Sequence, residues 1–363
     1  MHILLVITNL SPGNGPFQRI IKFDKSIKVS VISLVDNQKE LEEVSQQFGS
    51  DTSHVDLYGL DAKFKLVALF RLIAFTKKIK PDIVQSVTTL SDFLCIFLKY
   101  FLKIPIVSFE ATFISRWRPL KKYLILLVRS LFDEVICVSY DVQKKNANLN
   151  SFFRRKTKRS TIYNGVNFEL IDSIKKKSKY VSNKYTIGYT GDLKPTKNLS
   201  VLFYAFRDCY RLNSNLKLLI IGTGPDYNSL KKLAVELHID NSVEFTGQIS
   251  RVEVFERLKS IDLFVMPSLM EGLCESVVQA MASRVPVIVS DISQNQELVS
   301  HNKTGLLFTS NDSRSLKNEI LKIINNEINA NQLVNNARIY TEKFLNINNI
   351  TYQYTKLYEK YLK

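Results

Sequence analysis

A glutamate, a glycine and the start of a helix, in that order, form the strongest candidate for chemistry in this 363-residue chain. The run Met270–Gln279 reads M-E-G-L-C-E-S-V-V-Q and directly follows a short apolar run. The first N–H groups of a helix lack partners within the helix, and the helix dipole adds positive charge there. The turn at Gly272, followed by the N–H groups of Leu273 and Cys274, therefore predicts a phosphate site. A carboxylate just before it, that of Glu271, can hold sugar hydroxyls.

Two lysines follow another apolar run, Tyr185–Tyr189, and its glycine, Gly191. An ammonium group is a compact charge suited to phosphate oxygens, so Lys194 and Lys197 are candidate phosphate ligands. Gly222 ends a third run and permits a tight turn before a helix, and both Gly191 and Gly222 are candidate donor-binding residues. Taken singly, each feature also has an ordinary structural explanation, as a solvated lysine, an acidic first turn of a helix or a tight turn.

Metal and disulfide chemistry have little support in the composition. The four cysteines show neither paired nor metal-like spacing, which indicates small buried side chains in a reducing compartment. Only four histidines occur, so a zinc centre is not expected. The cysteines are Cys95, Cys137, Cys209 and Cys274.

The elements that must position these residues alternate between short β-branched runs and helical patterns. This alternation predicts an α/β fold with parallel sheets covered on both faces. The expected strands of the first half are His2–Thr8, Lys28–Leu34, Asp82–Val87, Ile104–Phe109 and Glu134–Ser139, and its expected helices are Phe17–Lys25, Phe64–Lys80, Leu90–Leu102 and Leu120–Leu131.

The same alternation restarts after a polar, basic segment. We therefore expect a first domain over 1–170, a linker over 171–184, a second domain over 185–345, and a helix over 346–363 that packs back on the first domain. The apolar N-terminus lacks a basic head and a cleavage site, so it is interpreted as a strand rather than a signal peptide. No window approaches the roughly 20 apolar residues of a membrane span, which favours a soluble or peripheral protein.

Several short motifs occur in an order that resembles the retaining family 4 glycosyltransferases. They are G-D-L-x-x-x-K-N, I-G-T-G-P, V-E-F-T-G, P-S-x-x-E-G-L-C-E-S-V-V-Q-A-M-A, P-V-I and N-K-T-G-L-L-F, all within residues 185–310. The match over 1–170 is looser. The resemblance implies a GT-B fold of two Rossmann-like domains that face each other across a cleft, and a nucleotide-diphosphate sugar as donor. It also implies that no divalent metal and no other cofactor is needed.

The resemblance also implies roles for single residues. Lys197 matches the basic residue that binds the donor diphosphate, and Glu271 matches the first carboxylate of the Glu–seven residues–Glu motif. Gln279 stands where the second glutamate holds the ribose. Two pairs match donor-binding loops: Gly13 and Gly15 in the first domain close over the phosphates, and Gly247 and Gln248 begin the loop that binds the base.

Three positions depart from the family pattern. Gln279 lacks the charge of the usual glutamate but keeps its hydrogen-bonding capacity. Asp192 stands where an arginine usually assists Lys197, which leaves Lys194 as a substitute. Glu110 stands where a histidine is usual, and it becomes a catalytic candidate that orients the acceptor hydroxyl; it also fits a strand-end surface carboxylate.

Charge is concentrated in the first half of the chain. Residues 1–180 hold 29 basic and 16 acidic residues, whereas 181–363 hold 21 and 18. A surplus of +13 favours an anionic partner, for which lipid headgroups fit better than nucleic acid because no base-reading motif occurs. The expected contacts are Arg116, Arg118, Lys121, Lys122, Arg154, Arg155 and Lys156, with Trp117 and the aromatics of Phe93–Phe101. Those aromatics fit a buried core better than a membrane contact.

The sequence therefore predicts a transferase, peripheral on the inner face of the cell membrane. It would move a sugar, by default UDP-linked, to a glycan or lipid-linked acceptor in bacterial surface polysaccharide (O-antigen or capsule) synthesis. Two alternatives remain open on the same scaffold: a nucleotide-sugar epimerase, and a non-catalytic nucleotide-sugar-binding protein.

Overall fold

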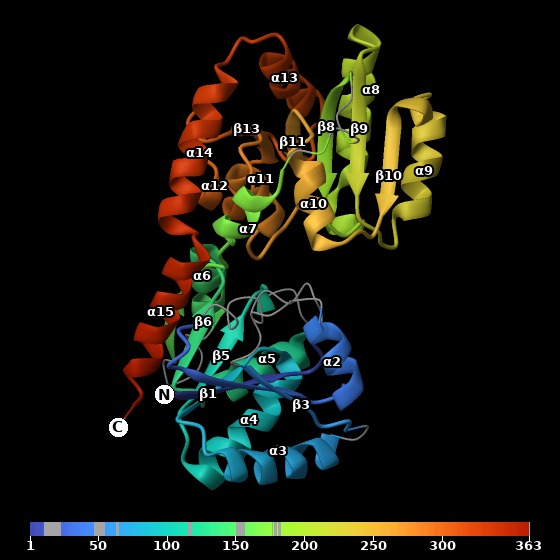
Figure 1. Ribbon diagram of the computed structural model, residues 1–363. Coiled ribbons are helices and arrows are strands. Elements are labelled where there is room, and N and C mark those ends of the chain that lie inside the picture. The colour runs from blue at the N-terminus through green and yellow to red at the C-terminus, as the bar shows by residue number, and fades with distance from the viewer. Residues whose placement is uncertain are drawn as a thin grey trace. The chain divides into compact units, whose positions relative to one another are not determined.

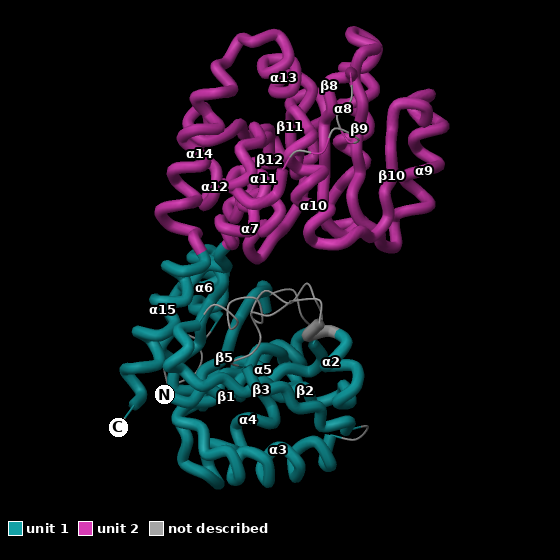
Figure 2. Tube along the Cα trace, in the orientation of Figure 1, with its two compact units in different colours: residues 1–165, 347–363 teal, residues 166–346 magenta. Residues whose placement is uncertain are grey.

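Two compact units make up the chain. The computed structural model describes residues 1–363 except 11–22, 47–54, 63–64, 115–117, 150–156, 176, 178–179, 181–182 and 363. The first unit contains residues 1–165 and 347–363, and the second contains 166–346 (Figure 2). Each unit is a parallel sheet with helices against it (Figure 1), which confirms the predicted pair of Rossmann-like α/β domains.

The sheet of the first unit has seven parallel strands. They are, in spatial order, β3 (Val55–Gly59), β2 (Lys28–Ser33), β1 (His2–Ile7), β4 (Ile83–Ser86), β5 (Ile106–Glu110), β6 (Glu134–Cys137) and β7 (Lys158–Thr161). Every residue of β1, β4, β5 and β6 is buried, as expected for central strands of a parallel sheet with both faces covered.

Helices connect these strands and bury their apolar sides against the sheet. They are α2 (Gln38–Gln46), α3 (Lys65–Ile79), α4 (Thr89–Leu102), α5 (Pro119–Arg129) and α6 (Tyr140–Leu149); the last helix of the chain, α15 (Ile347–Glu359), belongs to the same unit but connects no strands. Leu72 of α3, Leu98 of α4 and Val128 of α5 share one core cluster with Leu4 and Val84 of the sheet. Helices α3, α4 and α5 therefore cover the same sheet face.

The second unit repeats this plan with six parallel strands. They are, in spatial order, β10 (Val243–Gly247), β9 (Leu216–Ile221), β8 (Tyr185–Thr190), β11 (Leu263–Met266), β12 (Val287–Ser290) and β13 (Leu306–Phe308). Its helices are α7 (Phe168–Ser173), α8 (Leu199–Leu212), α9 (Tyr227–Glu236), α10 (Arg251–Leu258), α11 (Glu275–Ala282), α12 (Ser293–Leu298), α13 (Ser313–Ile324) and α14 (Ala330–Phe344).

The boundary between the units lies after Gly165, and the stretch predicted as a linker begins inside a helix. Asn167 caps α7 by accepting a hydrogen bond from the Leu170 N–H, and Phe168 and Ile171 are buried. The residues after Ile171 are mostly polar and show no helical periodicity, which is why the sequence predicts a linker from that residue onward.

Some elements could not be predicted from the sequence because most of their residues are polar. Strand β7 reads K-R-S-T and lies at the sheet edge, and helix α6 reads Y-D-V-Q-K-K-N-A-N-L. An edge strand and a solvated helix need few apolar residues, so neither gives a clear periodic pattern. The helix expected over Phe17–Lys25 lies outside the described residues except for its last three, which are not helical.

The last helix of the chain completes the first unit. The Tyr358 hydroxyl of α15 donates a hydrogen bond to Gln85 of β4, and the Tyr358 ring lies 6.1 Å from that of Phe23. Tyr354 and Tyr358 are both buried, so α15 fills one side of this core.

We expect Tyr358→Ala to lower the free energy of unfolding by about 3–5 kcal/mol, because it opens a cavity and leaves Gln85 without its partner. Tyr352→Ala on the exposed side of the same helix serves as the control, with an expected change of about 0.5 kcal/mol or less. Urea denaturation of both variants measures the difference. Equal losses would show that α15 does not stabilise the first unit through Tyr358.

Candidate active site

The loops after β8, β9 and β10 of the second unit interlock at the carboxyl edge of its sheet. The Leu193 N–H donates to the Thr223 carbonyl at 2.9 Å, which joins the loops after β8 and β9. The Gly222 N–H donates to the Gly247 carbonyl at 3.0 Å, which joins the loops after β9 and β10. Ligands of open α/β sheets bind at this edge, so these turns form the frame of a site.

Glycine is required in this frame for two different reasons. A side chain at Gly222 would place its Cβ 2.1 Å from the Gly191 carbonyl oxygen, so the two turns approach closely only without one. Gly247 has open space around it but a φ of +69°, a left-handed conformation that glycine adopts at no steric cost. The structure thus brings Gly191, Gly222 and Gly247 together, as the sequence analysis proposed for the donor loops.

An ion pair between Lys197 and Glu271 lies at the same edge. Lys197 ends the short 3₁₀ helix η5 (Pro195–Lys197), which follows β8, and Glu271 follows β11. The Lys197 Nζ lies 2.6 Å from the Glu271 Oε1, and the two side chains are 11% and 10% exposed. The Leu269 N–H donates to the Thr196 carbonyl at 2.9 Å and ties the two loops together. Two residues 74 positions apart therefore meet as the sequence analysis required.

Hydroxyl groups hold the carboxylate in place. The Ser268 hydroxyl donates to the Glu271 carboxylate, and the Ser290 hydroxyl of β12 donates to the Ser268 carbonyl. The Asn295 amide in turn donates to the Ser290 carbonyl at 3.0 Å. Ser268, Ser290 and Asn295 are buried, so their geometry is fixed by packing. Ser268 was not singled out from the sequence, although its place three residues before Glu271 in P-S-x-x-E was a usable signal.

Lys197 keeps its positive charge despite its burial. Burial alone would lower its pKa, but the negative charges of Glu271 and Asp192 and the hydrogen bond to Glu271 raise that pKa above its ordinary value. Burial, followed by the Glu271 charge, raises the pKa of Cys274, so its thiol stays protonated. Lys197 is therefore a fixed cation suited to an anionic ligand.

Helix α11 begins directly beside this pair. Its first flanking residue, Cys274, makes no side-chain capping hydrogen bond, and Gly272 and Leu273 are half-buried in the preceding turn. Gln279 is half-buried one turn further along the helix. The start of α11 adds partial positive charge next to Lys197, which favours phosphate at this point.

Two of the remaining predicted donor contacts are exposed. The Lys194 Nζ pairs with the Asp192 carboxylate at 3.0 Å, so Asp192 neutralises the lysine that was expected to replace the family arginine. Gln248 is exposed just after β10. The predicted phosphate loop at Gly13 and Gly15 lies outside the described residues.

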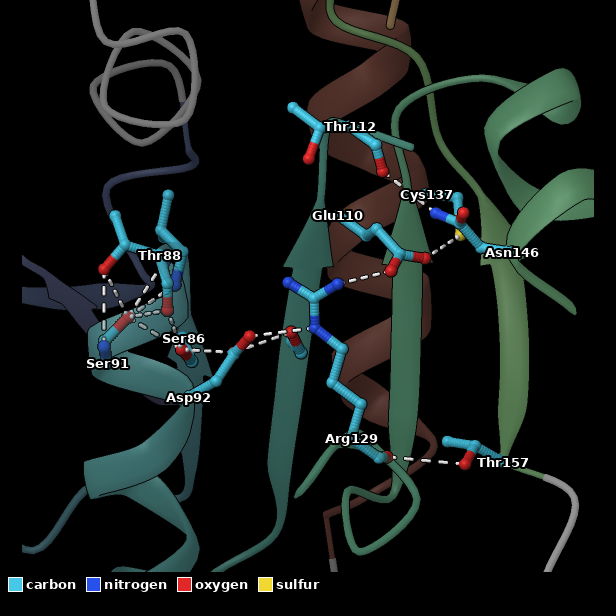
Figure 3. Close-up of polar contacts among 12 residues, drawn as sticks. Ser86, Thr88, Ser91, Asp92, Glu110, Thr112, Arg129, Cys137, Asn146 and Thr157 are labelled. Carbon is cyan, nitrogen blue, oxygen red and sulfur yellow. Dashed lines mark hydrogen bonds and ion pairs between the residues drawn. The ribbon is translucent and has the colours of Figure 1, made fainter. Parts of the chain in front are cut away.

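Glu110 occupies a different setting, in the interior of the first unit (Figure 3). Its carboxylate accepts hydrogen bonds from Arg129 and from Arg159, and its side chain is fully buried. Arg129 also donates to Asp92 at 2.9 Å. Glu110 is therefore not the surface carboxylate that was considered, and both of its oxygens are already engaged by guanidinium groups.

This buried network positions the end of β5. Asp92 accepts hydrogen bonds from Ser86 and Ser108, each at 2.7 Å. The Asn146 amide donates to the Thr112 carbonyl at 2.9 Å, just beyond Glu110 (Figure 3). The sequence offered no signal for this pairing, because Asp92, Glu110 and Arg129 lie on three separate elements.

Two family models together match most of the chain. The model for glycosyl transferases group 1 matches residues 171–340, and the model for glycosyltransferase family 4 matches residues 24–170. These matches fit the ion pair and glycine turns of the second unit. The chain belongs to the family 4 glycosyltransferases.

Relatives of this glycosyltransferase include proteins of archaea and bacteria. An uncharacterised glycosyltransferase of Methanocaldococcus jannaschii is 31% identical over 58% of this chain and 55% of its own length. The capsular polysaccharide biosynthesis glycosyltransferase CapM of Staphylococcus aureus is 24% identical over 100% of this chain and 97% of its own. An Escherichia coli enzyme named UDP-Gal:alpha-D-GlcNAc-diphosphoundecaprenol alpha-1,3-galactosyltransferase is 27% identical, over 82% and 78%.

A solved structure shares the fold over the full chain. Anabaena HepE, determined in complex with UDP and glucose, superposes with a TM-score of 0.82 at 18% identity and covers 99% of this chain and 100% of its own. The predicted GT-B fold of this glycosyltransferase is confirmed.

We expect Glu110→Gln to lower the free energy of unfolding by about 3–5 kcal/mol, because it leaves Arg129 and Arg159 partly unpaired in the interior. The control is Glu359→Gln, which breaks a half-exposed pair with Lys356 and is expected to change stability by about 1 kcal/mol or less. Urea denaturation measures both. A fully stable Glu110→Gln protein with impaired transfer would instead return Glu110 to a role at the acceptor.

Proposed function

We propose that this glycosyltransferase moves a sugar from a nucleotide-diphosphate sugar to a glycan or lipid-linked glycan acceptor, with retention of anomeric configuration. The observation that carries the proposal is the buried, charged Lys197 paired with Glu271 beside the start of α11. A cation held at a helix start suits a diphosphate, and the adjacent carboxylate suits sugar hydroxyls.

The chemistry requires stabilisation of the leaving group. The bond between the anomeric carbon and the phosphate oxygen breaks, and the electron pair stays on the departing nucleoside diphosphate. Lys197 and the N–H groups at the start of α11 stabilise that growing negative charge, which is the largest task in the reaction. The acceptor hydroxyl attacks from the same face, and its proton passes to the departing phosphate. Retention follows from this route.

The proposed donor is UDP-linked. Two named proteins support this choice: HepE was solved with UDP and glucose, and the E. coli relative is named for UDP-Gal. Gly247 and Gln248 are the proposed start of the base-binding loop, with Gln279 toward the ribose.

The proposed acceptor is carried on a lipid, in the synthesis of a bacterial surface polysaccharide such as capsule or O-antigen. The name of the E. coli relative gives a diphosphoundecaprenol-linked sugar as acceptor, and CapM is named for capsular polysaccharide. A lipid-linked acceptor places the enzyme at the inner face of the cell membrane, as a peripheral protein.

We expect Lys197→Ala and Glu271→Ala each to lower turnover by about 100-fold or more, because each removes one charged group from the donor site. The matched control is the exposed ion pair of α9: Lys232→Ala and Glu236→Ala should keep wild-type turnover. A thermal-shift screen of nucleotide sugars selects the donor, and release of nucleoside diphosphate with the acceptor present measures turnover. Wild-type rates in folded Lys197→Ala and Glu271→Ala proteins would refute the assigned site. If the wild-type protein bound a donor but transferred no sugar, the non-catalytic alternative would be favoured instead.

We expect transfer to continue unchanged in excess EDTA, since Lys197 and the α11 start, rather than a divalent cation, are proposed to balance the diphosphate charge. The same release assay, run with EDTA and then with added Mg²⁺, measures this. An activity that EDTA abolishes and Mg²⁺ restores would show that the proposed charge balance is incomplete.

A further inference from the structure

Helix α5 carries large apolar side chains on the side that faces away from its sheet. Leu120, Tyr123, Leu124 and Leu127 are all exposed, and Leu120 is 77% exposed. Their spacing of three, four and seven residues places them on one helix face. The inner face is also apolar, with Ile125, Leu126 and Val128 buried. Burial in the first unit therefore accounts for only one of the two apolar faces of α5.

The neighbouring helices repeat this arrangement. On α4, Phe97, Tyr100 and Phe101 are exposed at spacings of three and four residues, and Phe101 is 67% exposed. On α3, Leu66 and Phe70 are each 70% exposed, four residues apart. Helix α4 contacts both α3 and α5, and all three cover the same sheet face. These side chains form what we call the outer face of α3–α5.

The charges on these helices have one sign at the surface. Across 65–80, 89–103 and 118–129 the sole acidic residue is Asp92, which is buried in the Arg129 network. The exposed basic residues of the three helices and their ends are Lys65, Arg71, Lys77, Lys78, Lys80, Lys103, Arg118 and Lys121. Lys77 follows Phe70 by seven residues and so lies on the outer face.

Apolar stripes at helical spacing, flanked only by basic residues, are typical of helices that lie in a membrane interface. Scattered exposed apolar residues need no explanation, but a set that recurs on three adjoining helices marks an interaction site. Among the described residues, no helix is both long enough and apolar enough to cross a bilayer. The physical character of the outer face thus fits contact with a bilayer surface rather than insertion through it.

We propose that the outer face of α3–α5 docks on an anionic lipid bilayer, with the leucines and aromatics among the acyl chains and the lysines at the headgroups. Long lysine side chains reach the headgroup level while their stems stay in apolar surroundings. A second copy of the chain is a poorer occupant, because it would bring the same positive charge against this face. This docking rests on the proposed peripheral placement at the membrane, which it assigns to one face, and it does not depend on the donor site.

The other predicted membrane contacts, Arg116, Trp117 and the cluster 154–156, lie outside the described residues. Phe93, at the start of the predicted aromatic run, is partly buried and packs in the core. The structure therefore divides that run between core and surface, and the docking proposal rests on the exposed members alone.

The test is flotation of the full chain with vesicles of phosphatidylcholine, with and without phosphatidylglycerol. We expect wild-type protein to float mainly with the phosphatidylglycerol vesicles. Leu120→Ser/Leu124→Ser should weaken binding about tenfold by removing apolar contact, and Lys77→Glu/Lys78→Glu should do so by reversing charge. The matched controls are Val235→Ser/Ile339→Ser, at exposed apolar positions of the second unit, and Lys232→Glu/Lys303→Glu. Both controls should float like the wild type.

Two results would overturn the docking proposal. One is equal flotation of the outer-face variants and their controls. The other is a lipid-free dimer, seen by sedimentation, that Leu120→Ser/Leu124→Ser converts to monomer, which would assign the face to a second copy. Release of nucleoside diphosphate with a water-soluble acceptor should be unchanged in the outer-face variants, so failure of docking and failure of the transfer proposal give different results.

Discussion

At the carboxyl edge of the second sheet, an ammonium group has to stay charged while about nine-tenths of its side chain is buried. The structure meets this constraint by pairing Lys197 with Glu271: burial lowers the lysine pKa, but the charges of Glu271 and Asp192, together with the hydrogen bond to Glu271, raise it above its ordinary value. Without a ligand, the two charges neutralise each other. In the proposed reaction, the donor diphosphate takes Lys197 as its partner, which frees Glu271 to accept hydrogen bonds from the sugar. The pair thereby keeps both groups in position before the donor binds.

The first unit buries charge for a different purpose. Glu110 and Asp92 are held by guanidinium groups, whose planar forks fix several hydrogen bonds at once. A lysine has a single compact charge on a flexible stem and can exchange partners more easily. The arginine network therefore suits a fixed support for the end of β5, whereas the lysine pair suits a group that must change partner. The choice of basic residue thus distinguishes the buried structural network from the proposed ligand site.

The fold and the meeting of Lys197 with Glu271 at one sheet edge were largely predictable, because both depend on local patterns. Apolar runs and glycine turns identified the central strands, and Lys197 and Glu271 stood at the ends of two of them. The burial of Glu110 was not predictable in this way. Its burial depends on Arg129 and Arg159, which approach it only after β5, β6 and β7 pair, and no spacing in the sequence encodes that approach. The polar strand β7 was missed for another reason, since its edge position supplies no apolar pattern.

The apolar residues of α3, α4 and α5 show the limit of hydrophobic pattern as a guide to burial. A helix that is apolar on most sides is expected either in a large core or in contact with lipid. Because a sheet covers a helix on one side only, Leu94 and Leu98 of α4 are buried while Phe97 and Phe101 of the same helix are exposed. The pattern alone cannot divide such a helix between its two surroundings. Here the charges distinguish the two sides of these helices. Basic residues accompany the exposed apolar residues, and the sole carboxylate of the three helices, that of Asp92, is held inside by Arg129. An outer environment that is both apolar and anionic satisfies this arrangement, and a lipid surface has both properties.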